Sequence, residues 1–302
     1  GSVRGHEFAG EIVRVGKNVK DWRPGQRIVS DNTGHVCGRC PACERGDYLL
    51  CSEKVNLGLG YGYSGGFTKY CRIPGEILAI HKRAIWEIPE GLEYEEAAVM
   101  DPICNAYKAI AQRSGLLPGE NVVIFGTGPL GLFSVQIAKI MGALNIVVVG
   151  LEEDVKVRFG VARQLGATEV VNGSAEDVVK RCQEICGGSD SIGLVVDCAG
   201  ANICLKQAIE MVRCNGEIVR VGMGFKPVGF SINDISMKAV SIIGHMAYDA
   251  TSWRNSLQLL AAGRIQVKPM ITHRLGLSRW EEGFEAMADK EAIKVILTYD
   301  FD

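Results

Sequence analysis

The sequence lacks any large excess of charge of one sign. Lysine and arginine together number 33 and aspartate and glutamate 35, so the formal net charge is −2 and the pI is about 6.3. Without a basic field the protein does not attract phosphate backbones, so we expect no nucleic-acid partner. The chain carries no charged tail, no low-complexity tract and no internal repeat. With 47% hydrophobic residues, it can instead form a packed globular interior.

The sequence also lacks signals for export or for crossing a membrane. No signal peptide opens it. The longest uncharged stretch, Asn121 to Ala138, is long enough to suggest a membrane span, but Gly126-Thr127-Gly128-Pro129 lies in its middle. A strand followed by a helix explains this stretch better. We therefore expect a cytoplasmic protein with no membrane partner.

A disulfide framework is not indicated either. The chain has 11 cysteines, an odd number, and four of them lie within residues 37–51. The others are scattered, some inside apolar runs such as Val195-Val196-Asp197-Cys198. This distribution is typical of a reduced, intracellular protein with one metal cluster rather than of a secreted domain held by disulfides.

The length of 302 residues predicts two domains, because one ordinary hydrophobic core does not grow to that size. Residues 1–107 are rich in glycine, proline and short alternating runs, as in a β-rich domain. In residues 108–245, short apolar strands alternate with amphipathic helices, which predicts a doubly wound α/β domain with a parallel sheet covered on both faces. Residues 246–302 are expected to rejoin the first domain.

The individual elements follow from periodicity and from turn residues. We expect strands at 11–15, 26–29, 65–73, 122–125, 146–149, 169–171, 194–197, 217–221 and 294–299, and helices near 130–141, 155–165, 253–262 and 279–288.

A glycine motif, Gly126-Thr127-Gly128-Pro129-Leu130-Gly131, follows a predicted strand and opens a predicted helix. In that context the first glycine allows a tight turn, the second lets the backbone approach a pyrophosphate, and the third lets helix and strand pack closely. The helix N-terminus supplies oriented N–H groups and a partial positive charge. The motif therefore predicts a dinucleotide site; the alternative is an ordinary glycine-rich turn.

The acid that binds the ribose hydroxyls of such a cofactor normally ends the next strand. Here that strand ends in Gly150-Leu151, and Glu152, Glu153 and Asp154 follow. No arginine or lysine occupies residues 150–155 to meet a 2′-phosphate, which favours NAD over NADP, with Gly150 and Glu153 at the site. Alternatively, these acids only stabilise the N-terminus of the following helix.

The spacing Cys37-x2-Cys40-x2-Cys43-x7-Cys51 predicts a metal site. Four thiolates in one short loop match a closed, tetrahedral, structural zinc site. An iron–sulfur cluster favours a final gap of three residues followed by proline, whereas the final gap here is seven. A pair of disulfides is disfavoured by the reduced context.

Near the start lies Gly5-His6-Glu7, followed by Gly10-Glu11. This motif, the four-cysteine loop, Gly65-Gly66-Phe67 and the glycine motif, in this order and at these intervals, resemble the zinc-dependent medium-chain dehydrogenases from residue 3 to about 298. The resemblance implies a GroES-like catalytic domain, 1–107 and 246–302, split in sequence around a Rossmann coenzyme domain, 108–245.

The resemblance also implies a catalytic zinc. His6 matches the family's histidine ligand, and Glu7 is a ligand or supports one in some relatives. In sorbitol and threonine dehydrogenases an acid-proline pair stands at the third position, so Asp101 is the expected ligand, with Cys104 as the alternative used by classical alcohol dehydrogenases. The family's first cysteine ligand and its proton-relay hydroxyl would lie upstream of residue 1, so we expect an N-terminally incomplete chain.

The remaining cofactor contacts are expected at strand ends. Val221, Gly222 and Met223 end one predicted strand, and His245 corresponds to a segment near the nicotinamide carboxamide in the family. Ordinary strand-end turns are the alternative for both. No role is expected for the other histidines, and His81, which lies beside Lys82 and Arg83, is expected to be solvated.

These features predict a zinc-dependent oxidoreductase that uses NAD, or else NADP, and a small-molecule alcohol. Zinc polarises the alcohol oxygen and lowers the pKa of the hydroxyl, and an oxygen ligand such as Asp101 makes the metal a harder Lewis acid. The acid ligand resembles polyol and amino-alcohol dehydrogenases, so a vicinal diol or amino alcohol is the expected substrate. A zinc-free enone or quinone reductase and a non-catalytic dinucleotide-binding protein are the alternatives.

The family also implies a homodimer or homotetramer, formed through the edge of the Rossmann sheet. The apolar run at 236–244 is the expected edge.

Overall fold

A computed structural model describes residues 2–54 and 58–301 of the chain. The chain divides into two compact units. The first comprises residues 1–104, 247–288 and 294–302, and the second comprises residues 105–246 and 289–293. Helix α4, Met100–Tyr107, contains the boundary between residues 104 and 105.

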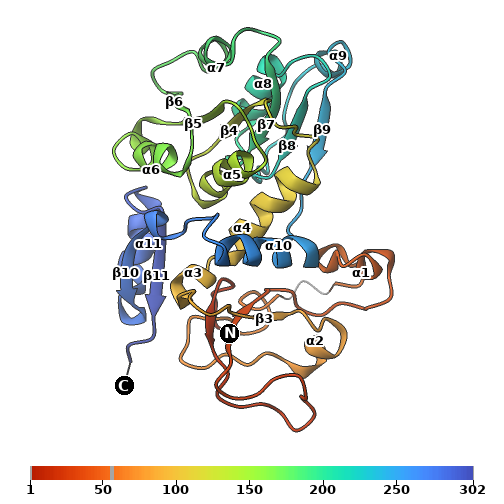
Figure 1. Cartoon of the computed structure of the whole chain (residues 1–302), viewed down its shortest axis with the longest axis vertical. Helices are drawn as coiled ribbons and strands as arrows, with labels where there is room; N and C mark the ends of the chain where they lie inside the picture. Colours follow the sequence, from red (N-terminus) through yellow and green to blue (C-terminus); the bar gives the residue numbers. More distant parts are fainter. Residues whose placement is uncertain (1, 55–57, 302) are drawn as a thin grey trace. The chain divides into compact units, whose positions relative to one another are not determined.

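The second unit is built on a six-stranded parallel sheet with the strand order β6-β5-β4-β7-β8-β9 (Figure 1). The chain moves outward from β4 to one edge and then returns to continue on the other side, which is the doubly wound order of a Rossmann domain. The strands are β4 (Asn121–Phe125), β5 (Ile146–Gly150), β6 (Glu169–Asn172), β7 (Ile192–Asp197), β8 (Glu217–Arg220) and β9 (Ser241–Gly244).

Helices cover this sheet, so the central strands are mostly apolar. Helices α5 and α6 pack together, α7 and α8 pack together, and both pairs contact the strands. The core between them includes Val123, Val147 and Val195, each fully buried. The helical elements are η2 (Lys108–Gln112), α5 (Pro129–Ile140), η3 (Glu152–Asp154), α6 (Arg158–Leu165), α7 (Val178–Cys186), α8 (Asn202–Met211) and α9 (Ile232–Ser236). The doubly wound prediction is confirmed.

The first unit contains two small sheets. Strands β1 (Ala9–Glu11), β2 (Arg27–Ser30) and β3 (Ile85–Glu87) pair antiparallel, and β10 (Ile271–Gly276) and β11 (Lys294–Thr298) pair in parallel. The other elements are α1 (Pro41–Glu44), η1 (Tyr48–Leu50), α2 (Gly75–Ile80), α3 (Tyr94–Ala97), α10 (Ala250–Ala261), η4 (Lys268–Met270), η5 (Leu277–Arg279) and α11 (Trp280–Ala288). Most of the residues before 100 lie in turns and loops rather than in strands.

Two predicted strands of the first unit are wrong. The strand expected at 11–15 lies at Ala9–Glu11, and Val13 is 62% exposed, so the alternation beyond residue 11 does not mark a buried face. The strand expected at 65–73 is absent from these described residues, which form turns and bends. Instead, the backbone N–H groups of residues 65–67 donate to carbonyls of residues 3–5.

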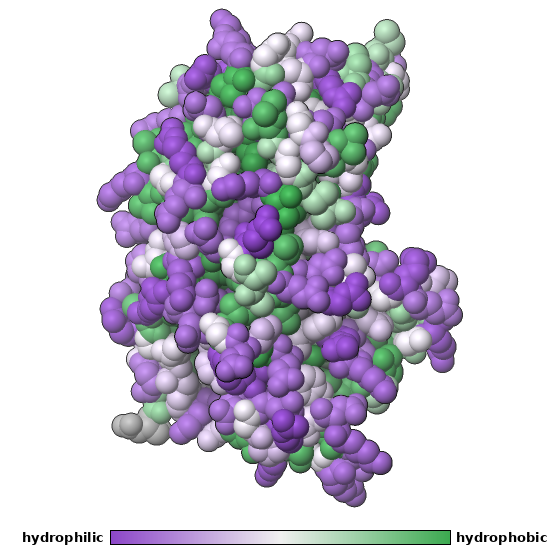
Figure 2. All heavy atoms as spheres, viewed as in Figure 1, coloured by the Kyte–Doolittle hydropathy of each residue, from purple (hydrophilic) through white to green (hydrophobic). Residues whose placement is uncertain are grey.

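The helix expected at 155–165 also differs, because the chain first forms the 3-10 turn η3 and then begins α6 at Arg158. Among the described residues no helix combines the length and the apolar character that crossing a bilayer requires. Figure 2 shows hydrophilic side chains over much of the viewed face, with apolar ones scattered between them.

Candidate active site and metal centres

The four-cysteine loop gathers its sulfurs in one place. Cys37, Cys40, Cys43 and Cys51 offer Sγ atoms that all lie within 4.8 Å of one another. Cys43 lies in the short helix α1, Cys40 is the N-cap of that helix, and the turn η1 leads to Cys51. Within the part of the chain that the structure describes, this is the one group of three or more histidine, cysteine or acidic side chains that meets this distance.

Backbone N–H groups point at these sulfurs. The N–H of Cys40 donates to Cys37 Sγ at 3.3 Å, and the N–H of Cys37 donates to Cys51 Sγ at 3.4 Å. N–H groups of Cys43 and Ser52 lower the pKa of the Cys40 thiol to about 6, whereas burial raises the pKa of Cys43 to about 12. A cluster that already favours a thiolate suits a soft divalent cation, and the residues fit zinc.

His6 and Glu7 lie in a loop that glycine-rich backbone holds in place. The N–H groups of residues 65–67 donate to carbonyls of residues 3–5 at 2.7 to 3.0 Å. A Cβ atom at Gly65 would lie 2.1 Å from the Gly5 carbonyl oxygen, so only glycine permits this approach. The sequence motif at 65–67 therefore serves to position the loop that carries His6.

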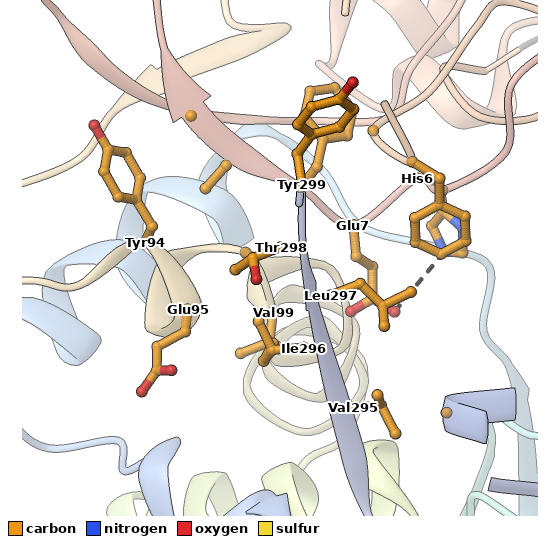
Figure 3. Close-up of a pocket in the computed structure, with 18 of the residues that line it drawn as sticks. His6, Glu7, Tyr94, Glu95, Val99, Val295, Ile296, Leu297, Thr298 and Tyr299 are labelled. Atoms are coloured by element: carbon orange, nitrogen blue, oxygen red, sulfur yellow. Dashed lines mark ion pairs between the residues drawn. The ribbon is translucent and has the colours of Figure 1, made fainter. Parts of the chain in front are cut away.

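The side chains of His6 and Glu7 face each other, with Nε2 and Oε1 3.9 Å apart (Figure 3). Burial lowers the pKa of His6, which keeps the imidazole neutral and able to bind a metal. Lys294 at the start of β11 donates to the Glu7 carboxylate. The Tyr61 ring stacks on His6 with centroids 4.9 Å apart.

Asp101 lies in the first turn of α4, and its carboxylate accepts a hydrogen bond from Asn32 Nδ2 at 2.9 Å. The negative charges of Asp101 and Glu7 help burial to raise the pKa of Tyr61, which places this ring near both carboxylates. Cys104, the alternative ligand, is fully buried, and burial raises its pKa well above the usual value.

Among the described residues, His6, Glu7 and Asp101 do not form a group comparable to the four-cysteine cluster. A cavity of about 1420 Å³ adjoins His6 and Glu7 in the first unit. Val295 and Leu297 of β11 line it, and Figure 3 shows Leu297 near Glu7 and Val295 further along the strand. Sequence reasoning did not identify Tyr61 or Lys294, because nothing local marks them.

One histidine prediction is wrong. His81 is 1% exposed, not solvated, and its Nε2 lies 3.1 Å from Asp31 Oδ2. The neighbouring Lys82 and Arg83 remain exposed, while the end of α2 turns the His81 ring inward.

In the second unit, the glycine motif forms the turn between β4 and α5. Gly126 has φ +105°, Gly128 is the N-cap of α5, and Pro129 occupies the first turn with Leu130. A Cβ at Gly131 would lie 2.0 Å from the Gly126 carbonyl oxygen, so helix and turn approach as closely as the motif predicts. The N–H groups at the start of this 12-residue helix can therefore face a pyrophosphate.

The end of β5 offers no side chain. A Cβ at Gly150 would lie 2.5 Å from the Phe159 ring and 2.8 Å from Asp154 Oδ2. Asp154 is buried and accepts from the Leu151 N–H at 2.8 Å. Glu153 is exposed at the surface and pairs with Lys290 at 2.6 Å, and this hydrogen bond lowers the pKa of Glu153.

Hydrogen bonds and an ion pair connect the ends of β7 and β8. The N–H groups of Val221 and Gly222 donate to the Asp197 carbonyl at 2.9 and 2.7 Å, and the buried Asp197 carboxylate pairs with Arg220. Met223 follows and is 77% exposed. Burial raises the pKa of Asp197. These contacts shape the carboxyl edge of the sheet, where doubly wound domains bind ligands.

His245 follows β9. Its Nε2 lies 3.1 Å from Asn105 Oδ1, and its N–H donates to the Arg220 carbonyl at 3.2 Å. This side chain is thus fixed within the second unit, at the strand end that the sequence indicated.

Two family models match the chain. Residues 1–83 match the alcohol dehydrogenase GroES-like domain, and residues 129–262 match the zinc-binding dehydrogenase model.

Known proteins are similar over nearly the whole chain. The uncharacterized zinc-type alcohol dehydrogenase-like protein YdjL of Escherichia coli strain K12 is 72% identical over 302 residues, which are 100% of this chain and 84% of that protein. The sorbitol dehydrogenase of Halalkalibacterium halodurans is 32% identical, covering 97% of this chain and 82% of that protein. The L-threonine 3-dehydrogenase of Bacillus licheniformis is 33% identical, covering 98% and 81%.

Solved structures are similar in fold. The alcohol dehydrogenase TADH from Thermus sp. ATN1 has a TM-score of 0.87 at 30% identity, covering 99% of this chain and 85% of that chain. A putative zinc-binding dehydrogenase from Sinorhizobium meliloti 1021, bound to NADP, has a TM-score of 0.86 at 28% identity, covering 98% and 83%.

Proposed function

The chain belongs to the zinc-dependent medium-chain dehydrogenase family, and from that premise we propose that it is an NAD(P)-dependent alcohol dehydrogenase that transfers a hydride between a secondary alcohol, polyol or amino alcohol and nicotinamide. The observation that carries the proposal is the neutral His6, held beside Glu7 by glycine backbone and stacked on Tyr61 near Asp101. These donors suit an open zinc site, and the second unit supplies a dinucleotide turn.

We assign two zinc ions to the first unit. Cys37, Cys40, Cys43 and Cys51 would hold a structural ion, and His6, Glu7 and Asp101 would contribute to a catalytic one. When bound, the catalytic zinc acts as a Lewis acid on the substrate oxygen, and the nicotinamide accepts the hydride.

The chain's own residues then have distinct tasks. His6 offers a neutral nitrogen, because burial disfavours its cationic form. Lys294 pairs with the Glu7 carboxylate and limits its movement. The Tyr61 ring covers one face of His6 and limits access of water to it. In the second unit, the first turn of α5 would hold the pyrophosphate, and the hydrogen-bonded ends of β7 and β8 would contact the rest of the cofactor.

The substrate class rests on Asp101 as a third, oxygen ligand and on the names of the relatives, which include sorbitol dehydrogenase and threonine dehydrogenase. A panel of polyols, amino alcohols and primary and secondary alcohols, with NAD and NADP and added zinc, tests it. We expect turnover of one series of vicinal diols or amino alcohols. Turnover of primary alcohols alone would contradict the class.

For the cofactor we propose NAD, with Glu153 at the ribose hydroxyls. Gly150 provides no side chain, and the buried Asp154 already accepts a hydrogen bond from the Leu151 N–H. Glu153 is exposed, and its hydrogen bond with Lys290 lowers its pKa, which favours the carboxylate. The Glu153→Gln variant should therefore lose about tenfold in kcat/KM with NAD, the effect of one hydrogen bond to a charged group, while kcat/KM with NADP stays unchanged.

The matched control is Glu285→Gln, which alters an exposed acid on α11 and should leave both cofactors unaffected. An unchanged kcat/KM with NAD in Glu153→Gln would remove Glu153 from the site. Equal use of NAD and NADP by the unaltered protein would contradict the NAD assignment.

We also propose a cytoplasmic homo-oligomer that forms at β9, an edge strand of the sheet. Ile242 on this strand is 36% exposed, and nearby Met237 and Ile232 are 85% and 67% exposed. Two copies can pair this edge antiparallel about a two-fold axis. Sedimentation should give a dimer or tetramer, and Ile242→Lys should shift it toward monomer. A monomeric unaltered protein would contradict the interface.

A further inference from the structure

A buried polar cluster lies behind Asp101 in the first unit. Asp31, Asn32, His81 and Tyr248 are 4%, 8%, 1% and 2% exposed. Buried polar groups are costly unless they are hydrogen-bonded, so a connected cluster of this kind holds a defined geometry. None of the metal-ligand or cofactor assignments above uses these four side chains.

The cluster fixes the backbone of Asn32 on both sides. Its N–H donates to the Tyr248 hydroxyl oxygen at 3.0 Å, and its carbonyl accepts from the Leu59 N–H at 3.0 Å. The Tyr248 hydroxyl donates to Asp31 at 3.3 Å, and the other oxygen of Asp31 lies 3.1 Å from His81. Asn32 therefore has little freedom to move.

The side chain of Asn32 points from this fixed backbone to the candidate metal ligand. Its Nδ2 donates to Asp101 Oδ2 at 2.9 Å. A hydrogen bond of this kind orients a metal-binding carboxylate and limits its rotation. The cluster also reaches the four-cysteine loop, because the His81 ring lies 4.0 Å from the ring of Tyr48, which packs against the cysteines.

We propose that Asn32 is a positioning residue for the catalytic metal, with its amide orienting the Asp101 carboxylate and the Asp31–His81–Tyr248 cluster holding Asn32 in place. The inference rests on the proposed function, since it requires Asp101 to be a zinc ligand. Through the contact between Tyr48 and His81, the four-cysteine loop also touches the polar cluster that holds Asn32.

The test is a zinc titration in metal buffers, with cobalt spectra to distinguish the two sites. Asn32→Ala should weaken the second, non-cysteine site by about 10-fold to 100-fold, as loss of a partner of a metal ligand does. The thiolate-to-cobalt absorption of the cysteine site should be unchanged. Asn32→Asp, which has the same shape but puts a carboxylate beside Asp101, should weaken that site more than alanine does.

Thr33→Val is the matched control. Thr33 is 1% exposed and adjacent in sequence, and its hydroxyl has no hydrogen-bond partner among the described residues, so metal binding should not change. Tyr248→Phe removes the hydroxyl that accepts from the Asn32 N–H, so it should weaken the second site less than Asn32→Ala does. If Asn32→Ala does not fold, the zinc affinity of Tyr248→Phe tests the inference in its place.

Three outcomes with the variants would overturn the inference. They are normal affinity of Asn32→Ala for both zinc ions, equal losses in Asn32→Ala and Thr33→Val, and an Asn32→Asp variant that binds like the unaltered protein. If the unaltered protein binds a single zinc, the proposed catalytic site fails and the inference fails with it. If the unaltered protein binds two zinc ions and Asn32→Ala binds both with unchanged affinity, the inference is wrong but the proposed function stands.

Discussion

The His6→Ala and Asp101→Ala variants should each lose at least about a thousandfold in kcat/KM, because removing a ligand of a Lewis-acid metal costs several kcal/mol of transition-state stabilisation. Steady-state nicotinamide reduction with the preferred alcohol measures the loss. Metal analysis should show that each variant retains the zinc of the four-cysteine loop, since neither residue contacts it. The loss then belongs to the catalytic site and not to the fold.

Matched controls separate these effects from the loss of any histidine or aspartate. His35→Ala removes another partly buried histidine, and Asp21→Ala removes an exposed aspartate. Both should keep kcat/KM within about twofold, because neither side chain is a proposed ligand of the catalytic zinc. If Asp101→Ala keeps most of the activity while a Cys104→Ala variant loses it, the third ligand is the cysteine and the assignment of Asp101 is wrong.

The second large effect is expected in the four-cysteine loop. Cys43→Ala should release one zinc ion per chain and lower the unfolding midpoint of the first unit by about 10 °C, because roughly 4 kcal/mol or more of metal-binding energy also stabilises the fold. The loop has a small core of its own, Val36, Cys43 and Cys51, which does not replace that energy. Metal analysis and thermal unfolding, with and without a chelator, measure both quantities.

Cys182→Ala is the control for this variant. Cys182 is also buried, but it lies in α7 of the second unit and is not one of the four clustered cysteines. Its loss should cost about 1 kcal/mol for the small cavity and release no zinc. A Cys43→Ala protein that keeps its zinc and its unfolding midpoint would show that the loop does not bind a structural metal.

The Rossmann domain could be predicted from the sequence because its signals are local. A fully covered parallel strand such as β5 must be apolar throughout, and the turn at Gly126 needs glycine for steric reasons that any chain obeys. The four-cysteine loop is equally local, since all its sulfurs come from 15 consecutive positions, 37–51.

The surroundings of the candidate catalytic site could not be predicted in the same way. Lys294 reaches Glu7 and Tyr248 reaches Asn32 across more than 200 residues, and no periodicity marks such pairs. The prediction that His81 is solvated was wrong because its neighbours Lys82 and Arg83 suggest a surface position. In the folded chain the buried Asp31 pairs with His81, and the sequence gives no local sign of that pair. The strand expected at 65–73 failed because its glycines serve a backbone contact with residues 3–5.

The measurement that tests the central assignment most directly follows the hydride itself. The zinc-loaded protein is given the alcohol that it turns over, labelled with deuterium on the carbinol carbon, together with oxidised nicotinamide cofactor, and the reduced cofactor is analysed by mass spectrometry. A zinc-dependent alcohol dehydrogenase must deliver the deuterium to the nicotinamide ring, and the transfer must stop when the catalytic zinc is removed. Reduced cofactor without deuterium, or unchanged transfer by protein stripped of zinc, would contradict the account.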